Sequence, residues 1–173
     1  MQFYSGFSLK NEVHFFDTFI KRSDYTIAGF SYGAIAALNA ALNAVESSQR
    51  IDTLQLFSPA FFQTKNEKFK RLQTMAYKKS ESTYMKQFIS SCFSPYQVKD
   101  ISHKETSIKE LQELLYYEWS LDDLKKVESS GVKIEVYLGG EDKIIDSMSA
   151  KEFFLENTTV TYIKNANHFL QTN

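Results

Sequence analysis

The sequence contains little cysteine, glycine or proline, and each shortage excludes a class of fold. Cys92 is the one cysteine among 173 residues, so no disulfide can form within the chain, and we expect a reducing, cytoplasmic environment. Six glycines and two prolines make up about 5% of the chain, where average usage would give roughly 12%. A sandwich or barrel of many short strands needs more turn residues than this.

Long apolar runs and an excess of one charge are also absent. No run of about 18 apolar residues predicts a membrane span, and Met1–Ser5 lacks the basic and apolar regions of a signal peptide. The formal charge is −1, from 20 Lys and Arg against 21 Asp and Glu, which disfavours a generally basic nucleic-acid-binding protein.

No cluster of Cys, His and acidic residues has the spacing of metal ligands, so we expect neither a metal nor another cofactor. The length favours one domain over residues 1–173.

The chain does contain an alternation of strand-like and helix-like segments. Between the strand-like runs, apolar residues recur at steps of three and four in Val13–Ile20 and Ile35–Val45, which is typical of helices that cover a sheet. Such an alternation predicts right-handed crossovers and a parallel sheet, and hence an α/β fold. The five predicted strands are Met1–Ser5, Tyr25–Gly29, Thr53–Ser58, Lys133–Leu138 and Thr159–Lys164.

The segment from about residue 60 to 118 interrupts this alternation. It is nearly sixty residues long, has mostly helical character and contains no convincing strand. An ordinary crossover between neighbouring strands is much shorter. We therefore expect a helical cap, inserted after the third strand, which Pro95 divides into two parts.

The pattern Gly-Phe-Ser-Tyr-Gly at Gly29–Gly33 lies where the second predicted strand ends and an alanine-rich helix begins. A serine in a tight strand-to-helix turn exposes its hydroxyl at the carboxyl edge of the sheet, and flanking glycines avoid collisions with the neighbouring backbone. The N–H of Tyr32, at the N-terminus of the helix, can stabilise a negative oxygen. We therefore predict Ser31 as a nucleophile; a simple glycine-rich turn is the alternative.

A serine hydroxyl is barely nucleophilic at neutral pH and needs a base. The sequence offers three histidines. His168 follows the last predicted strand and should emerge at the carboxyl edge, where the catalytic groups of open α/β sheets collect. His14 and His103 are expected to be surface or packing residues, so His168 is the predicted base.

The histidine in turn needs an acceptor that fixes its tautomer. Asp142 lies in the turn directly after the strand Lys133–Leu138 and therefore near the same edge. Glu141 and Asp146 in the same loop are its competitors. Asp142 is the predicted acid.

These motifs together resemble those of the α/β-hydrolases. The chain order Ser31, Asp142, His168 is the order of the triad in that family. The resemblance implies a minimal α/β-hydrolase fold of about five parallel strands with flanking helices and a cap. It covers nearly all of the chain outside the cap.

The turn Ser5-Gly6-Phe7 resembles the His-Gly-x turn of the same family. The resemblance implies that the N–H of Phe7 is a second oxyanion donor beside that of Tyr32. Three departures from the family are expected. Ser5 replaces the usual His. Only about 25 residues separate Gly6 from the nucleophile, so the strand and helix that normally lie between them are expected to be absent. The first two strands of the family are expected to be absent as well.

Within the family, the short chain, the Ser-Gly-Phe opening and the Gly-Phe-Ser-Tyr-Gly pattern are similar to the BioV-type esterases of biotin synthesis. This resemblance implies hydrolysis of the methyl ester of pimeloyl-acyl-carrier-protein methyl ester through an acyl-enzyme. It implies an acyl carrier protein as the partner that presents the substrate. The alternatives are a general short-acyl carboxylesterase, an acyl thioesterase, an acyltransferase and a non-catalytic binding module on the same fold.

A basic segment in the predicted cap bears on the partner independently. Between residues 60 and 80, six positive residues accompany a single acid, Glu67, and give a local charge of +5. Such a segment near the mouth of the site would attract an acidic macromolecule such as an acyl carrier protein. A solvated helix face is the alternative, and no recognition motif for nucleic acid accompanies the segment. The predicted partner-binding residues are Lys65, Lys68, Lys70, Arg71, Lys78 and Lys79.

Overall fold

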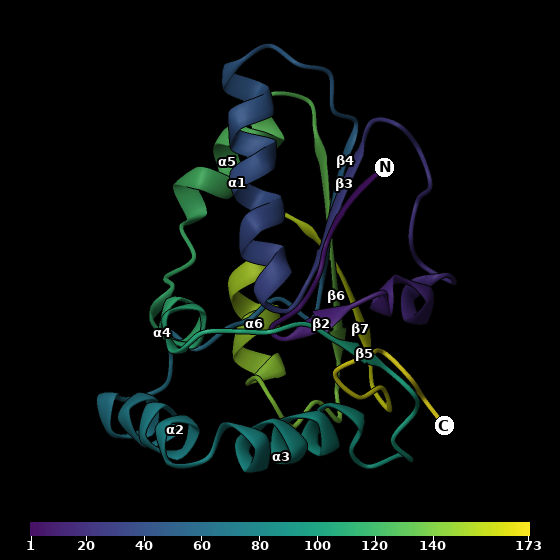
Figure 1. The fold of residues 1–173 in the computed structure, drawn as a ribbon. Coiled ribbons are helices and arrows are strands. Elements are labelled where there is room, and N and C mark those ends of the chain that lie inside the picture. The colour runs from purple at the N-terminus through teal and green to yellow at the C-terminus, as the bar shows by residue number, and fades with distance from the viewer.

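The computed structural model describes residues 1–173 and contains a five-stranded sheet in which all strands are parallel (Figure 1). The strand order is β1-β3-β4-β6-β7, so the chain adds strands in sequence order from one edge of the sheet to the other. The register pairs Gly29 with Tyr4 on one side and with Leu56 on the other, which brings the carboxyl ends of these strands to a common edge. All five predicted strands are confirmed. They are β1 (Gln2–Tyr4), β3 (Thr26–Phe30), β4 (Thr53–Phe57), β6 (Lys133–Gly139) and β7 (Thr159–Ile163).

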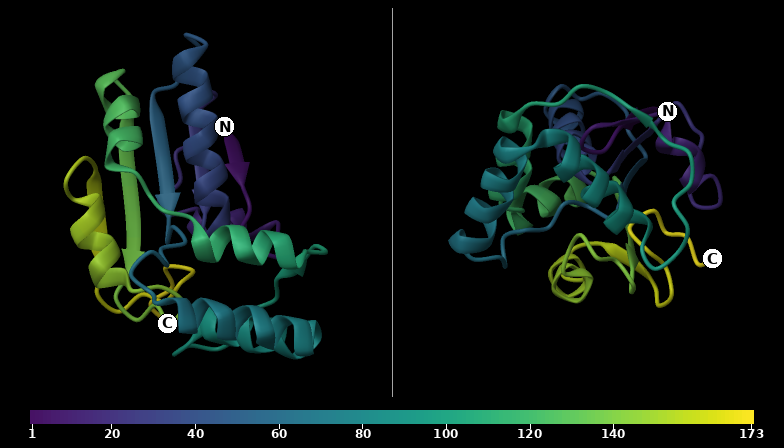
Figure 2. Two further views of the ribbon diagram at one scale, coloured as in Figure 1. Left: turned by 90° about the vertical axis from the view of Figure 1, so that its left-hand side faces the viewer. Right: turned by 60° about the horizontal axis from the view of Figure 1, so that its bottom comes forward.

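Helices cover one face of this sheet (Figures 1 and 2). The alanines Ala34, Ala37 and Ala41 are fully buried on the inner side of the first helix, because their small side chains let the helix backbone approach the strands closely. A core of 26 buried residues fills this layer. The covering helices are α1 (Tyr32–Glu46), α5 (Leu121–Ser129) and α6 (Ser147–Phe154).

The opposite face carries no α-helix and is covered by the chain between β1 and β3. The predicted helix over Val13–Ile20 is wrong, because only one short 3-10 helix forms there, over Glu12–Phe16. The side chain of Asn11 makes no capping hydrogen bond, and the aromatic and β-branched residues of this segment have low helix propensity. Burial against the sheet decides the conformation instead, since the ring of Phe16 stacks on that of Phe57 with centroids 4.6 Å apart.

The cap consists of three helices between β4 and α5, and two of them, α2 and α3, lie across the end of the sheet at which the strands terminate (Figure 2). The cap also contains a strand for which the sequence carries no signal. In it, β5 (Ser102–His103) pairs antiparallel with β2 (Leu9–Lys10). Each of these strands has two residues and β5 is exposed, so no apolar alternation marks them. The cap helices are α2 (Glu67–Lys79), α3 (Glu81–Phe93) and α4 (Ile108–Tyr116).

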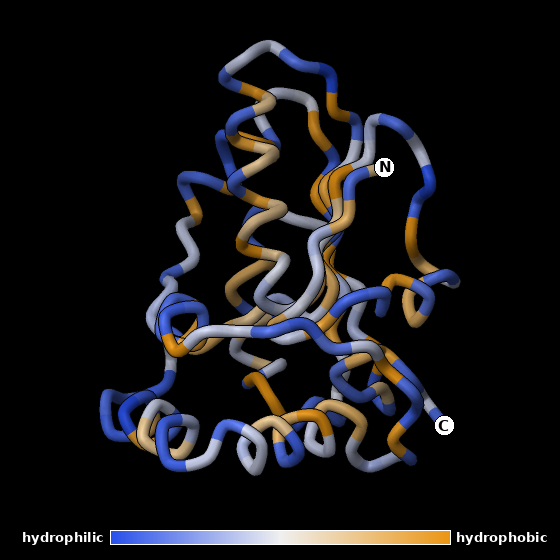
Figure 3. Tube along the Cα trace, viewed as in Figure 1, coloured by the Kyte–Doolittle hydropathy of each residue, from blue (hydrophilic) through white to orange (hydrophobic).

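Hydropathy follows this arrangement. Hydrophobic residues concentrate along the strands of the sheet, whereas α2 is largely hydrophilic (Figure 3). None of the helices combines the length and the apolar composition needed to cross a membrane.

Candidate active site

Ser31 lies in a sharp turn between β3 and α1, with backbone angles φ 52° and ψ −116°. A positive φ is unfavourable for a residue with a Cβ, and the turn is held by the Ser31 N–H, which donates to the Phe57 carbonyl over 2.9 Å. Two glycines make the turn possible: a Cβ on Gly29 would lie 2.3 Å from the Gly33 oxygen, and one on Gly33 would lie 2.1 Å from the Tyr4 oxygen. This is the geometry of a nucleophile elbow. It places the serine at the carboxyl edge of the sheet.

The side chains of Ser31, His168 and Asp142 form a continuous hydrogen-bonded chain. His168 Nε2 lies 3.0 Å from Ser31 Oγ, and His168 Nδ1 lies 2.6 Å from Asp142 Oδ2. The imidazole and the carboxylate are both fully buried. With the Nδ1 proton donated to Asp142, Nε2 is free to accept a proton from the serine hydroxyl. The structure thus brings the predicted nucleophile, base and acid into contact.

The loop after β6 orients the Asp142 carboxylate. Asp142 Oδ1 accepts the N–H groups of Ile144 and Ile145 over 2.7 and 3.2 Å, which leaves Oδ2 for the histidine. The loop packs tightly against the histidine loop, because a Cβ on Gly139 would lie 2.3 Å from the Asn167 oxygen. The two loops therefore meet without space for a side chain between them.

The competing acids and histidines lie elsewhere. Asp146 is the N-cap of α6 and accepts the N–H of Ser149 over 3.1 Å; hydrogen bonds from the N–H and the hydroxyl of Ser149 lower the pKa of the Asp146 carboxyl. Glu141 pairs with a neighbouring lysine at the surface. His14 and His103 are exposed, so neither approaches the serine.

Asn167 also shapes the site, although its residue type and position alone gave no signal of a role. It is fully buried. Its Nδ2 donates to the Phe93 carbonyl at the end of α3 over 2.9 Å, and its Oδ1 accepts the N–H groups of Phe169 and Gln171, each over 3.0 Å. These bonds hold the chain on both sides of His168 and tie it to the cap.

Two N–H groups are positioned as the predicted oxyanion donors. The N–H of Tyr32 is the first of α1, where N–H groups have no partner within the helix. The N–H of Phe7 donates to no acceptor in the protein, although the residue is 1% exposed. Both residues follow the ends of adjacent strands, β3 and β1, and the elbow touches the Phe7 turn, since a Cβ on Gly33 would lie 2.5 Å from the Ser5 oxygen. The oxyanion role of the two groups stays a prediction.

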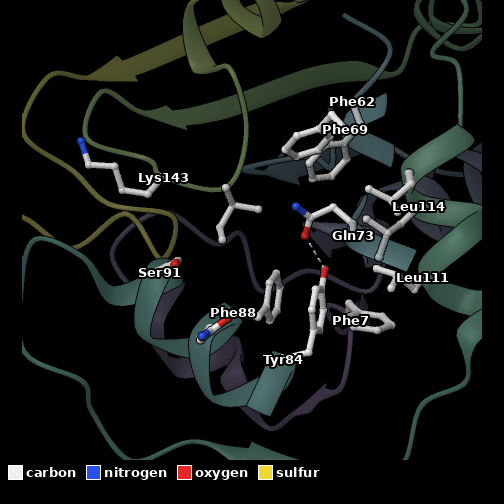
Figure 4. Close-up of a pocket in the computed structure, with 13 residues that line it drawn as sticks. Phe7, Phe62, Phe69, Gln73, Tyr84, Phe88, Ser91, Leu111, Leu114 and Lys143 are labelled. Atoms are coloured by element: carbon white, nitrogen blue, oxygen red, sulfur yellow. Dashed lines mark hydrogen bonds between the residues drawn. The ribbon is translucent and has the colours of Figure 1, made fainter. Parts of the chain in front are cut away.

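A cavity of about 240 Å³ lies between this edge of the sheet and the cap (Figure 4). It touches the predicted oxyanion turn at Phe7 and the acid loop at Ile144, whereas Ser31 lies outside its wall. Nine of its 13 lining residues are hydrophobic, and most of them come from α2, α3 and α4. Burial raises the pKa of Tyr84 to about 12, so its hydroxyl stays protonated and donates to Gln73 over 3.1 Å. Such a space suits an apolar chain.

Four of the six predicted partner-binding residues are exposed, namely Lys68, Arg71, Lys78 and Lys79. Lys65 is half-buried, with Nζ 5.7 Å from the centroid of the Phe69 ring. Lys70 is a correction to the prediction. It is 6% exposed, and its Nζ lies 5.0 Å from the centroid of the Tyr116 ring, so its side chain packs against the cap and adds little to the exposed surface of α2.

No family model and no curated protein matches the sequence, but the structure is similar to several solved structures. It matches BioG from Haemophilus influenzae with a TM-score of 0.60 and 10% identity, over 98% of this chain and 88% of that one. It matches naproxen esterase (carboxylesterase NP) from Bacillus subtilis with a TM-score of 0.56 and 18% identity, over 85% and 54% of the two chains. A bromoperoxidase from Bacillus anthracis matches with a TM-score of 0.59 and 14% identity, over 83% and 60%.

These identities are low, so the likeness concerns the fold. The chain spans about half the length of the naproxen esterase. Its fold is a minimal α/β-hydrolase fold, with five parallel strands, flanking helices and a cap inserted after the third strand of the sheet. The fold class predicted from the sequence is thereby confirmed. On this fold, a buried Ser–His–Asp chain at the carboxyl edge is the arrangement used by serine hydrolases.

Proposed function

We propose that the protein is a serine hydrolase that cleaves carboxylic esters through an acyl-enzyme. His168 accepts the proton of Ser31 as the serine Oγ attacks the ester carbonyl carbon. The N–H groups of Tyr32 and Phe7 stabilise the oxyanion of the tetrahedral intermediate. His168 then donates its proton to the leaving alcohol, and Asp142 stabilises the imidazolium throughout. Water repeats the sequence on the acyl-enzyme and releases the free acid.

The observation that carries this proposal is the hydrogen-bonded chain from Asp142 through His168 to Ser31, with distances of 2.6 and 3.0 Å. Packing alone would require hydrogen bonds for buried polar groups, but it would not require a serine with a positive φ in a strand-to-helix turn. Carboxylesterases among the structures with a similar fold support the same reaction class.

A fluorophosphonate probe tests the nucleophile directly. We expect a single covalent adduct on Ser31, mapped by peptide mass spectrometry, and hydrolysis of p-nitrophenyl esters that Ser31→Ala abolishes. Ser90→Ala is the matched control, because Ser90 is an exposed serine of the cap, and its hydroxyl makes no hydrogen bond to a histidine of the kind that joins Ser31 to His168. Labelling of another serine, or full esterase activity in Ser31→Ala, would contradict the proposal.

We further propose the finer assignment that the substrate is the methyl ester of pimeloyl-acyl-carrier-protein methyl ester, in biotin precursor synthesis. Support comes from the resemblance of Ser5–Phe7 and Gly29–Gly33 to the BioV-type esterases. The similarity to BioG over nearly the full length of both chains adds to it. A cytoplasmic location, in which Cys92 stays reduced, is part of this proposal.

The partner in this proposal is an acyl carrier protein that docks on the outer side of α2. Lys68, Arg71 and Lys79 share this side with Leu72 and Met75, because their spacings of three, four and seven residues place them on one helical stripe. Leu72 is 52% and Met75 62% exposed. Apolar side chains ringed by positive charge are complementary to an acidic amphipathic helix.

Reversal of positive charges on α2 distinguishes binding of the carrier protein from cleavage of the ester bond. Lys68→Glu with Arg71→Glu should raise KM for a carrier-bound ester steeply and leave cleavage of a small free ester nearly unchanged, and added salt should weaken only the first reaction. Lys99→Glu with Lys125→Glu is the control for net charge, since both lysines are exposed outside α2. Equal losses on both substrates would contradict docking on α2.

The leaving group is decided by a second comparison on one carrier protein. Pimeloyl-carrier-protein methyl ester contains both bonds, the methyl ester at one end of the acyl chain and the thioester to the carrier at the other, so release of methanol or of the free carrier thiol shows which bond is cleaved. We expect kcat/KM to favour the methyl ester. Preference for the thioester would reassign the protein as an acyl thioesterase.

A further inference from the structure

Glu12 is a buried carboxylate that the proposed reaction does not use. It is fully buried, and no Lys, Arg or His nitrogen lies within 4.0 Å of its oxygens. Its Oε1 accepts the N–H of Gly6 over 2.7 Å, and its Oε2 has no hydrogen-bond partner. Burial of a carboxylate without a cation or a full set of donors is costly, so a packing role alone explains it poorly.

The single partner of Glu12 lies in the turn that carries Phe7. The Gly6 N–H is held by Glu12, and the Gly6 carbonyl accepts the N–H of Leu9 over 3.2 Å. Gly6 is therefore fixed at both of its peptide groups. A Cβ at Gly6 would lie 2.8 Å from the Phe30 ring, so the glycine also rests directly on the sheet.

These bonds determine where the N–H of Phe7 points. The Gly6 carbonyl and the Phe7 N–H belong to one planar peptide group, in which the two point in opposite directions when the bond is trans. A Gly6 carbonyl turned toward Leu9 therefore aims the Phe7 N–H the other way, and that N–H donates to no acceptor in the protein. The turn is anchored again beyond Phe7, where Ser8 Oγ donates to the Lys104 carbonyl over 3.1 Å.

We infer that Glu12 is a positioning residue of the oxyanion hole. It holds Gly6 so that the peptide between Gly6 and Phe7 presents its N–H to the oxyanion that forms when Ser31 attacks. The inference rests on the proposed esterase function. The hydrogen bond from Ser8 Oγ to the Lys104 carbonyl holds the turn in the absence of Glu12. Removal of the carboxylate should therefore change the direction of the Phe7 N–H and leave the path of the backbone unchanged.

The test uses purified Glu12→Ala and Glu12→Gln proteins and a p-nitrophenyl ester. Glu12→Ala should lower kcat by about 10- to 100-fold, less than the loss of a complete oxyanion donor, with KM within about twofold because the ester in its ground state does not need the oxyanion donors. Glu12→Gln should retain most of kcat, since the amide oxygen still accepts the Gly6 N–H. Asp17→Ala, an exposed acid of the same segment, should behave like the wild type.

A second measurement distinguishes a changed direction of the Phe7 N–H from a general disturbance of the active-site structure. A trifluoromethyl ketone forms a tetrahedral adduct with Ser31 and needs the oxyanion hole, whereas the corresponding alcohol does not. Glu12→Ala should weaken inhibition by the ketone by the same factor as kcat and leave inhibition by the alcohol unchanged. Equal weakening of both would overturn the inference, because it would assign Glu12 a structural role.

The remaining outcomes are also decisive. If Glu12→Ala does not fold, Glu12→Asp takes its place, because the shorter side chain keeps the charge and withdraws the acceptor from Gly6. A wild-type kcat in Glu12→Ala or in Glu12→Asp overturns the inference. Failure of the alanine, glutamine and aspartate variants of Glu12 all to fold overturns it as well. A wild-type protein that neither takes the fluorophosphonate on Ser31 nor cleaves esters overturns the proposed function itself, and this inference falls with it.

Discussion

Asp142 and Asp146 lie in one loop, four residues apart, and their hydrogen bonds separate their roles. Asp142 Oδ2 lies 2.6 Å from His168 Nδ1, whereas Asp146 accepts the N–H of Ser149 at the start of α6. A buried carboxylate on the imidazole fixes its tautomer and stabilises the imidazolium. An N-cap stabilises only its helix.

The first prediction follows from that difference. Asp142→Asn should lower kcat for a p-nitrophenyl ester by about 10⁴-fold, because an amide at this position favours the wrong tautomer of His168. Asp146→Ala should leave kcat unchanged and lower the free energy of unfolding by about 1 kcal/mol. Steady-state kinetics and urea denaturation measure the two effects. The reverse pattern would assign the acid to Asp146.

At the scale of elements, the elbow depends on contact between α1 and β1. The first turn of α1 lies directly on the end of β1, because a Cβ on Gly33 would meet the carbonyl oxygens of Tyr4 and Ser5 at 2.1 and 2.5 Å. Gly131, in the turn between α5 and β6, offers the contrast. Its φ is +87°, but a Cβ at this position would have no neighbouring atom within 4 Å.

Alanine at these two glycines should therefore have unequal effects. Gly33→Ala should lower the free energy of unfolding by about 3 kcal/mol or more, because backbone oxygens cannot move aside as flexible side chains can. Gly131→Ala should cost only about 1 kcal/mol, from its positive φ. Thermal and urea unfolding of both variants check this. A Gly33→Ala protein as stable as the wild type would show that α1 can shift away from β1.

At the scale of the whole molecule, a polar network lies on the second face of the sheet, beside the aromatic cluster that covers most of that face. Glu135 is buried on this face, in β6, and pairs with Lys21 and Lys133 at 2.7 and 2.8 Å. The Lys21 N–H also donates to the side chain of Gln55 over 2.7 Å. Burial alone would raise the pKa of Glu135, but hydrogen bonds from Lys133, Lys21, Tyr137 and Gln55 outweigh it and lower the pKa to about 2.

This network predicts how stability depends on pH. The folded pKa of Glu135 lies below its ordinary value of 4.5, so its contribution is complete above pH 4.5 and is lost as the pH falls toward 2. Glu135→Gln should lower the free energy of unfolding by about 1–2 kcal/mol at pH 7, because the carboxylate charge, whose partners lower the pKa to about 2, is lost, while water around the half-exposed Lys21 and Lys133 screens part of its effect. More than half of the difference from the wild type should be gone at pH 3.

Urea denaturation between pH 7 and pH 3 measures this difference. Glu118→Gln, an exposed acid, is the control and should follow the wild type at every pH. A constant difference between Glu135→Gln and the wild type across this range would contradict the role of the Glu135 charge.

Much of the fold and of the candidate site was predictable because the relevant signals are local. Each strand of the five-stranded sheet and most helices carry a local sequence signal, and the parallel topology then brings the strand ends together at one edge. Ser31 and His168 are 137 residues apart and hydrogen-bonded, yet each is recognisable from its position directly after a strand. For the same reason Asp142 could be preferred over Asp146, which lies four residues farther from its strand.

The sequence by itself thus determined the positions of the five main strands along the chain, the elbow and the residue types at the sheet edge. Only the tertiary structure decided which of several similar residues is buried and what it contacts. Lys70 looks like its exposed neighbours until Tyr116, from another helix, covers it, and Glu12 looks like a surface acid until its segment folds onto Gly6. Over Val13–Ile20, likewise, only a short 3-10 helix forms, because the aromatic rings of this segment pack on the sheet. The physical reason is common to all three: a side chain's environment is set by the element that packs on it, and that element lies elsewhere in the chain.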